Sequence, residues 1–269
     1  MSVGPTILKL GGSVITVKDK PFTANKRAIT RLAAEVKRAD VDSLVLVHGG
    51  GSFGHPVAKE YRINEGYRDE LQIMGFSQTH QAMTALNRLV VASLINHDIP
   101  AMDVQPSSCV VTKSGRIEVM ETKPLTKLLE IGFVPVLYGD AVVDSAKGFA
   151  ILSGDQLASS LAIRLGAHHI IIGVDVDGLY SADPKTNLSA YLIEQITAEE
   201  LKKLHHKIGE TNVADVTGGM PQKIMELTAA VEHGVPTTIV NAAKPNNIFR
   251  ALKGEKVVGT TIERGLMDA

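Results

Sequence analysis

The segment 44-LVLVHGGGSFGHPVAKEY-61 joins a short apolar run to consecutive glycines, and His55 follows a few residues later. Glycine lets the backbone come close to a ligand and adopt positive φ. A second apolar run, 6–10, also ends in a Gly-Gly pair. One such loop alone would be interpreted as a tight turn. Two loops in the same position after a strand instead favour a pair of backbone nests that bind anions.

Apolar runs rich in β-branched residues alternate with longer stretches of helical periodicity. We predict strands at 6–10, 43–48, 133–139, 168–174 and 236–240, and helices at about 25–39, 69–97, 122–131, 155–166, 197–206 and 219–233. Several of the strands are apolar throughout, which is typical of a parallel sheet covered by helices on both faces. The sequence therefore predicts an α/β fold, a three-layer αβα sandwich with a largely parallel open central sheet.

Two segments, 102–122 and 141–152, have the pattern of β-hairpins or loop insertions, with turn signals at Ser114-Gly115 and Lys147-Gly148. The length of 269 residues fits one large α/β domain or two small ones. No linker rich in Pro, Gly or Ser divides the chain. We therefore expect a single domain, 1–269, with lobes at about 1–150 and 151–269 that share one sheet.

Composition narrows the class of protein. The formal net charge is −1, so no basic field points to nucleic acid or to a membrane surface. The longest apolar runs, such as 89–95, are too short to span a bilayer. The single cysteine, Cys109, cannot form an internal disulfide, and we interpret it as a small core residue in a reducing compartment. Since the N-terminus enters a strand within a few residues, we see no signal peptide and expect a cytoplasmic protein.

Lysines lie where an anion site would need them. Lys9 lies within an apolar strand, where its charge is costly to bury unless an anion meets it. Lys18 follows the first glycine loop, although 17–20 is equally compatible with a solvated turn. Lys223 opens a helix just after 215–220, and by itself it also fits a helix surface.

Acidic residues lie in matching positions. Asp155 follows Ser153-Gly154 at a predicted helix start, where it could act as a cap. Asp175 and Asp177 follow the predicted strand 168–174 and could simply form a turn. Alternatively, these carboxylates contact a nucleotide or orient the lysines. Neither a GxxxxGK[ST] loop nor a flanked GxGxxG fingerprint occurs, so the phosphate site is of another kind.

Several segments together resemble the amino acid kinase superfamily. They are 9-KLGGS-13, 47-VHGGGSFGH-55, 153-SGD-155, 175-DVDGLYSADP-184 and 217-TGGMPQK-223. They occur in the expected order and cover nearly the whole chain; each is weak alone, but the set is specific. The resemblance implies an open αβα sandwich in which the first lobe holds the phosphoryl acceptor and the second holds ATP.

The second loop narrows the resemblance. The stretch 48-HGGGSFGHP-56 resembles the isopentenyl phosphate kinases, which transfer the γ-phosphate of ATP to isopentenyl phosphate. Acetylglutamate, uridylate and glutamate 5-kinases usually differ here. The alternative is a kinase of another small phosphate or phosphonate, such as fosfomycin. A nucleotide-binding protein without turnover and a plain amino acid kinase are further alternatives.

The expected chemistry needs no strong base, because the acceptor is already an oxyanion. Positioning and electrostatics then provide the catalysis. The expected cofactors are ATP and Mg²⁺, although no metal-ligand cluster stands out. The expected partner is a small-molecule substrate, and a homodimer is implied by analogy with relatives. We find no catalytic triad or nucleophile elbow.

The resemblance implies roles for individual residues. Lys9, Gly11, Gly12, Ser13 and Gly51 contact ATP phosphates; Asp175, Gly219 and Lys223 contact the nucleotide; Gly50, His55 and Gly154 bind the acceptor phosphate; Lys18 stabilises the transition state; and Asp155 orients the lysines. The catalytic set is therefore Lys18, Lys9 and Asp155.

Three further residue assignments complete the expectations. We interpret His48 mainly as strand-end packing that supports the loop. Pro221 departs from the expected pattern but is tolerable in the first turn of a helix. An apolar stripe on 69–97 (Ile73, Phe76, Met83 and Leu86) is interpreted as core rather than as a pocket for an isoprenoid tail.

Overall fold

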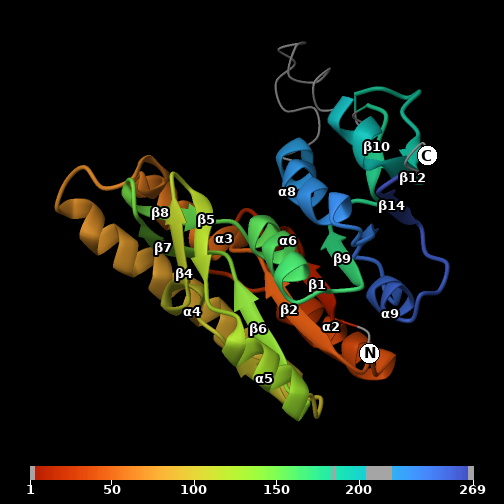
Figure 1. Cartoon of the computed structure of the whole chain (residues 1–269), viewed down its shortest axis with the longest axis horizontal. Coiled ribbons are helices and arrows are strands. Elements are labelled where there is room, and N and C mark those ends of the chain that lie inside the picture. Colours follow the sequence, from red (N-terminus) through yellow and green to blue (C-terminus); the bar gives the residue numbers. More distant parts are fainter. Residues whose placement is uncertain (1–3, 183, 185, 204–219, 266–269) are drawn as a thin grey trace.

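The computed structural model describes residues 4–182, 184, 186–203 and 220–265 (Figure 1). Within this part of the chain, eight strands form the main sheet in the order β12-β14-β13-β9-β1-β2-β6-β3. Its strands are β1 (Thr6–Leu10), β2 (Leu44–His48), β3 (Ala101–Asp103), β6 (Val134–Tyr138), β9 (His169–Val174), β12 (Gln195–Thr197), β13 (Thr237–Asn241) and β14 (Gly259–Glu263). Neighbouring strands are parallel except β13 and β14. The predicted largely parallel, open sheet is confirmed.

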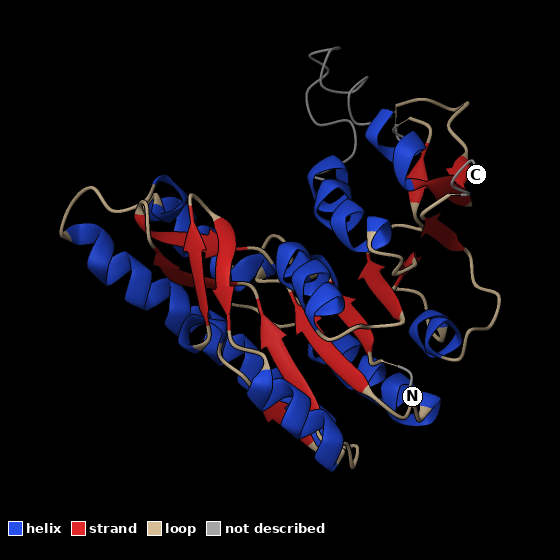
Figure 2. Ribbon diagram, in the orientation of Figure 1, coloured by secondary structure: helices blue, strands red, loops and turns tan. Residues whose placement is uncertain are grey.

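Helices cover both faces of this sheet (Figure 2). One face packs against α2 (Lys26–Ala39), α4 (Leu71–Ile95) and α9 (Asn247–Leu252), and the other against α5 (Lys123–Ile131), α6 (Gly154–Arg164) and α8 (Met220–Glu232). Successive residues of β1 enter opposite cores, because strand side chains alternate: Ile7 lies in one core and Leu8 in the other. This double burial explains why the central strands are apolar throughout.

The predicted hairpins form a second sheet of four strands among the described residues, in the order β5-β4-β7-β8. Its strands are β4 (Val110–Lys113), β5 (Arg116–Met120), β7 (Asp140–Asp144) and β8 (Gly148–Leu152). Asp144 joins the two turns, since its carboxylate accepts N–H groups of Ser114, Gly115 and Lys147 at 2.7–3.0 Å. These hydrogen bonds hold the pKa of Asp144 well below its usual value.

Several elements differ from expectation. The described chain also contains α1 (Gly12–Ile15), α3 (Gly51–Glu60), the 3-10 helices η1 (Ile63–Glu65) and η2 (Pro106–Ser108), and a small pair of strands, β10 (Leu179–Tyr180) and β11 (Leu192–Ile193). The sequence patterns did not predict these elements, nor the short edge strands β3 and β12, strand β14 or helix α9. Predicted helix 197–206 is helical over 198–203, and its remainder lies outside the described residues.

Helix α3 shows why pattern reasoning failed there. Its glycines lower helix propensity, and Pro56 has no N–H for the Ser52 carbonyl one turn earlier. In the folded chain, the backbone N–H of Phe22 donates to that carbonyl at 3.0 Å. A segment distant in sequence thus supplies the hydrogen bond that proline removes, and the helix continues through Pro56.

Candidate functional site

A cavity of about 500 Å³ lies at the carboxyl ends of the central strands. Its wall is built from the segments that follow β1, β2, β6 and β9 and from the first turn of α6. Strand β1 lies between β2 and β9, so the chain leaves β1 toward one side of the sheet and later returns on the other. Ligands of open parallel sheets bind at such switch points.

The two glycine loops are packed against each other, backbone to backbone. A Cβ on Gly12 would lie 2.2 Å from the Gly51 nitrogen, and one on Gly51 would lie 2.2 Å from Thr16 Oγ1. Thr16 Oγ1 donates to the Gly12 carbonyl at 2.7 Å and accepts the N–H of Ser52 at 3.1 Å. Glycine is therefore required at these positions for loop contact as well as for access to a ligand.

Helices α3 and α6 both begin at the cavity. Their first residues, Gly51 and Gly154, line it. Ser153 caps α6 by accepting the N–H of Gln156 at 3.1 Å. The N-terminus of a helix carries partial positive charge and unsatisfied N–H groups, so this end of the sheet favours phosphate oxygens.

A buried ion pair forms the floor of the cavity. Lys9 Nζ lies 2.7 Å from Asp155 Oδ1, with side-chain exposures of 3% and 11%. The contact has the distance of an ion pair but not the geometry of a directed hydrogen bond. A Cβ on Gly154 would lie 3.2 Å from the His48 carbonyl oxygen, so glycine lets the start of α6 approach the end of β2 closely. The predicted neighbours Lys9 and Asp155 thus meet in the cavity wall.

Other predicted site residues divide by position. The cavity wall contains Lys9, Gly12, Ser13, Lys18, Gly50, Gly51, His55, Gly154, Asp155 and Asp175. Lys18, His55 and Asp175 are exposed. Gly11 is not part of the wall; its N–H donates to the Gly173 carbonyl at 2.7 Å behind it. The resemblance implied that Gly11 contacts ATP, whereas its N–H is directed toward β9 by this hydrogen bond.

Two predicted nucleotide contacts are not placed. Gly219 lies outside the described residues, and only the backbone of Lys223 is described, within α8. Pro221 lies in the first turn of α8, as predicted.

His48 is buried beneath the second loop. Its Nε2 lies 3.1 Å from Asn87 Oδ1, its Nδ1 lies 3.1 Å from the Gly49 carbonyl, and its ring stacks on Tyr138 at 5.5 Å. Burial lowers the pKa of His48 to about 4, so the ring is neutral at pH 7. The histidine supports the loop from behind, in agreement with its predicted role.

The cavity also has an apolar wall. Ala58, Met83, Ile151 and Leu152 line it. A Cβ on Gly50 or Gly54 would lie 2.9 or 2.7 Å from the Met83 sulfur, so these glycines make room for that side chain.

The interpretation of the helical stripe as core is confirmed for Leu86, which is fully buried in a core cluster. Met83 is also buried, but its side chain lines the cavity as well. Phe76 packs on Phe149 at 5.4 Å, and Ile73 is 54% exposed. One helical face thus serves both core and pocket, a division that periodicity does not reveal.

Sequence reasoning missed Asp140, a buried carboxylate in the cavity wall. His80 Nδ1 lies 3.0 Å from both carboxylate oxygens of Asp140, and this contact raises the pKa of His80. When it is protonated, His80 offsets the charge of the carboxylate, which lowers repulsion of an anionic ligand. The pair joins α4 to β7, and no short-range pattern links these residues.

The carboxylate of Asp177 binds neighbouring side chains of the protein. Its carboxylate accepts from Asn241 Nδ2 at 3.0 Å and from Lys244 Nζ at 2.9 Å. The Lys244 contact lowers the pKa of Asp177.

Among the described residues, no three His, Cys, Asp or Glu side chains gather as a metal site. None of the helices in this part of the chain combines the length and apolarity that a bilayer crossing requires.

Comparison with known proteins agrees with this geometry. The model of the amino acid kinase family matches residues 4–241. The chain is 44% identical to the isopentenyl phosphate kinase of Methanothermobacter thermautotrophicus over 264 residues, covering 95% of this chain and 98% of that protein. It is 38% identical to the isopentenyl phosphate kinase of Methanocaldococcus jannaschii over 269 residues, covering 96% and 98%. An X-ray structure of isopentenyl phosphate kinase superposes with a TM-score of 0.84 at 40% identity, covering 96% of this chain and 99% of that one. The chain therefore belongs to the amino acid kinase family and, within it, to the isopentenyl phosphate kinases.

Proposed function

We propose that this chain transfers the γ-phosphate of ATP to isopentenyl phosphate and so produces isopentenyl diphosphate. The observation that carries the proposal is one cavity with two chemically different kinds of lining residue. Glycine loops, helix N-termini and Lys9 supply groups that suit an anion, while Met83, Ile151 and Leu152 supply apolar side chains. A small phosphorylated hydrocarbon has the same two halves. The relatives named isopentenyl phosphate kinase support this choice of acceptor.

The mechanism follows from the residues present. An oxygen of the acceptor phosphate attacks the γ-phosphorus in line, the bond to the β–γ bridging oxygen breaks, and ADP leaves. No base is needed, because the attacking oxygen is already ionised. Lys9 and Lys18 offset the negative charge that accumulates between the two substrates. Asp155 holds Lys9 in place through the buried ion pair.

We assign the acceptor phosphate to Gly50, His55 and Gly154, and the ATP phosphates to Lys9, Gly12, Ser13 and Gly51. All of these residues line the cavity. Asp175, Gly219 and Lys223 are assigned to the nucleotide. The lobe at about 151–269 then holds the nucleotide, and the lobe at about 1–150 holds most of the acceptor together with the ATP phosphates. Gly11 is assigned a supporting contact behind the phosphate loop. We further propose a cytoplasmic homodimer.

The residues of this site are suited to hold Mg²⁺ together with the substrate phosphates. Mg²⁺ is usually held by one or two carboxylates together with substrate oxygens, and it neutralises charge on the transferring group when bound. Because Asp155 is engaged with Lys9, Asp175 on the cavity wall is the better placed carboxylate to hold it.

An acceptor panel tests the proposal. ADP release with Mg-ATP is measured for isopentenyl phosphate, fosfomycin, UMP, glutamate and acetylglutamate. Strong turnover with isopentenyl phosphate is expected. Turnover only with fosfomycin would support the alternative, a phosphonate kinase, and turnover with none of them would leave a nucleotide-binding protein.

We expect His55→Ala to raise KM for isopentenyl phosphate by about 10- to 100-fold, which corresponds to one lost hydrogen bond to a charged group. KM for ATP should change far less, because His55 lies on α3 among the residues that are assigned to the acceptor phosphate. Steady-state kinetics with each substrate varied in turn provide the measurement. Lys59→Ala, an exposed change on the same helix, is the control. Equal effects on both KM values would argue against this role.

We expect Met83→Ala to shift specificity toward longer acceptors, since it removes the side chain that fills the cavity beside Gly50 and Gly54. The ratio of kcat/KM for geranyl phosphate to that for isopentenyl phosphate should rise about tenfold. Met74→Ala is the matched control, because Met74 lies on the same helix but is 59% exposed. An unchanged ratio in Met83→Ala would place the hydrocarbon tail elsewhere.

A further inference from the structure

We propose that Arg31 and Glu35 on α2 are positioning residues for the nucleotide, although neither lines the cavity. They hold the segment 241–249, which in turn holds the end of β9 and the first glycine loop. The inference rests on the proposed use of this cavity for ATP, and it adds a role for two residues outside the cavity.

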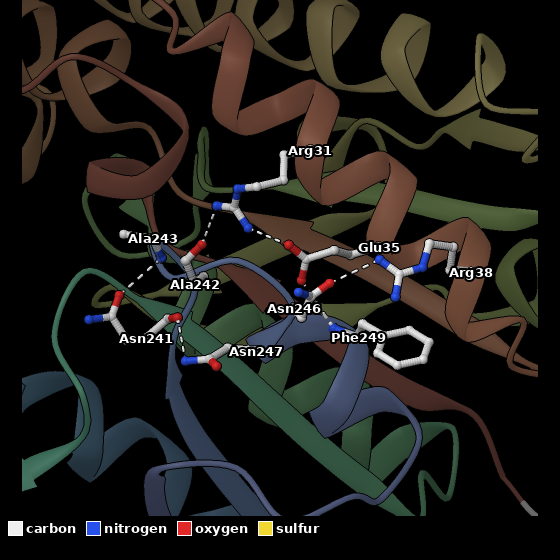
Figure 3. A network of polar contacts seen from close by, with 9 residues as sticks. All are labelled: Arg31, Glu35, Arg38, Asn241, Ala242, Ala243, Asn246, Asn247 and Phe249. Carbon is white, nitrogen blue, oxygen red and sulfur yellow. Dashed lines mark hydrogen bonds and ion pairs between the residues drawn. The ribbon is translucent and has the colours of Figure 1, made fainter.

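The contacts are direct (Figure 3). One Arg31 nitrogen, Nη1, pairs with Glu35 Oε1, and the other, Nη2, donates to the Ala242 carbonyl at 2.5 Å. Glu35 Oε2 accepts the backbone N–H of Phe249 at 3.2 Å. The pair therefore fixes both ends of the connection between β13 and α9.

Glu35 also replaces a missing helix cap. Asn246, the N-cap residue of α9, makes no side-chain capping hydrogen bond. The Glu35 carboxylate supplies an acceptor to the first turn of that helix instead, and its negative charge suits a helix N-terminus. Glu35 is 2% exposed, so Arg31 is needed to balance its charge.

The segment 241–249 is connected to the cavity by a short series of backbone contacts. The N–H of Ala242 donates to the Val174 carbonyl at 2.7 Å, and the next residue, Asp175, lines the cavity. A Cβ on Gly173 would lie 2.8 Å from Ala242 Cβ, so the two backbones are in close contact. The Gly173 carbonyl accepts the N–H of Gly11 in the first glycine loop.

A second set of contacts ties the same segment to the turn after β9. Asn241 Nδ2 and Lys244 Nζ both donate to the Asp177 carboxylate. Asp177 lies two residues after Asp175 in the chain. A displacement of 241–244 would therefore move both Asp175 and the turn that follows it. The acceptor is assigned to α3 and α4, which pack closely on each other.

The two contacts of the Arg31 guanidinium can be tested by substitution. A guanidinium donates from separate nitrogens to a carboxylate and to a carbonyl, whereas a lysine ammonium is a single point charge on a shorter side chain. Arg31→Lys keeps the charge beside Glu35 but loses the bridge to Ala242. Glu35→Gln keeps an acceptor for Phe249 but loses the charge that pairs with Arg31.

The experiment measures ADP binding by calorimetry, KM for each substrate and the thermal unfolding midpoint. We expect both variants to bind ADP about tenfold more weakly, with a similar rise in KM for ATP and an unchanged KM for the acceptor. Lys37→Ala is the matched control, since Lys37 lies on the same helix but donates to the Asp98 carbonyl, away from the segment 241–249. It should bind ADP like the unmodified chain.

Two outcomes would overturn the inference. Unchanged ADP affinity in both variants, with a lowered unfolding midpoint, would show that the pair only stabilises the fold. Equal losses for ATP and acceptor would show a general distortion. ADP binding does not depend on the acceptor, so failure to phosphorylate isopentenyl phosphate would reject the proposed function while this measurement still decided the role of Arg31.

Discussion

Lys18→Ala is expected to lower kcat by about 10²- to 10³-fold, the effect of removing one preorganised group that stabilises transition-state charge. Lys18 is exposed on the cavity wall in the turn after α1, so it can reach the transferring group without being part of the buried floor. The ground-state contacts of ATP are assigned to other residues. KM for ATP should therefore change by less than about threefold.

The measurement is steady-state kinetics supported by ADP calorimetry. Lys20→Ala is the matched control, because Lys20 is also exposed, lies two residues away and does not line the cavity. It should leave kcat unchanged. A nearly normal kcat in Lys18→Ala would reject the catalytic role and return this segment to the solvated-turn interpretation.

Lys9→Met is expected to abolish measurable turnover and to lower the free energy of unfolding by about 3–5 kcal/mol. Counted over the whole residue, Lys9 is 2% exposed and its partner Asp155 is 8% exposed. Removing the cation leaves a buried carboxylate without its counter-charge, which is the costly way to break an ion pair. The same change removes the cation from the floor of the phosphate site.

A double variant separates stability from catalysis. Lys9→Met combined with Asp155→Leu replaces both charges by apolar groups, so denaturant unfolding should recover most of the lost free energy while activity stays absent. Recovery of activity in the double variant would show that Lys9 is structural only. An unfolding free energy unchanged in the single variant would show that Asp155 does not depend on Lys9.

The central strands were predictable because their environment is uniform. β1, β2 and β9 are covered on both faces, so every residue is apolar or pairs with a specific partner, and the pattern is visible without tertiary information. The predicted strand ends differ from the structure by at most one residue. Glycines at the carboxyl ends of β1 and β2 then marked the cavity edge.

Residues whose role depends on distant contacts were not predictable in this way. Helix α3 continues through Pro56 because Phe22 supplies a hydrogen bond to Ser52. Met83 lines the cavity because Gly50 and Gly54 leave space for its sulfur. Asp140 lines the cavity in contact with His80, which lies on another element. None of these pairs leaves a periodic trace in the sequence.

Local sequence patterns were sufficient to predict the layered α/β fold, the positions of the glycine loops and the presence of a lysine within the first strand. Apolar periodicity and glycine placement are local, and they carry this information directly. The packing of the folded chain was needed to show that Gly12 lines the cavity while Gly11 hydrogen-bonds to Gly173 behind it, and that α2 contacts the segment 241–249. It was also needed to show that Lys9 and Asp155 form a buried ion pair. Those distinctions depend on which backbones and charges meet across the sheet, and chain folding alone brings them within hydrogen-bond distance.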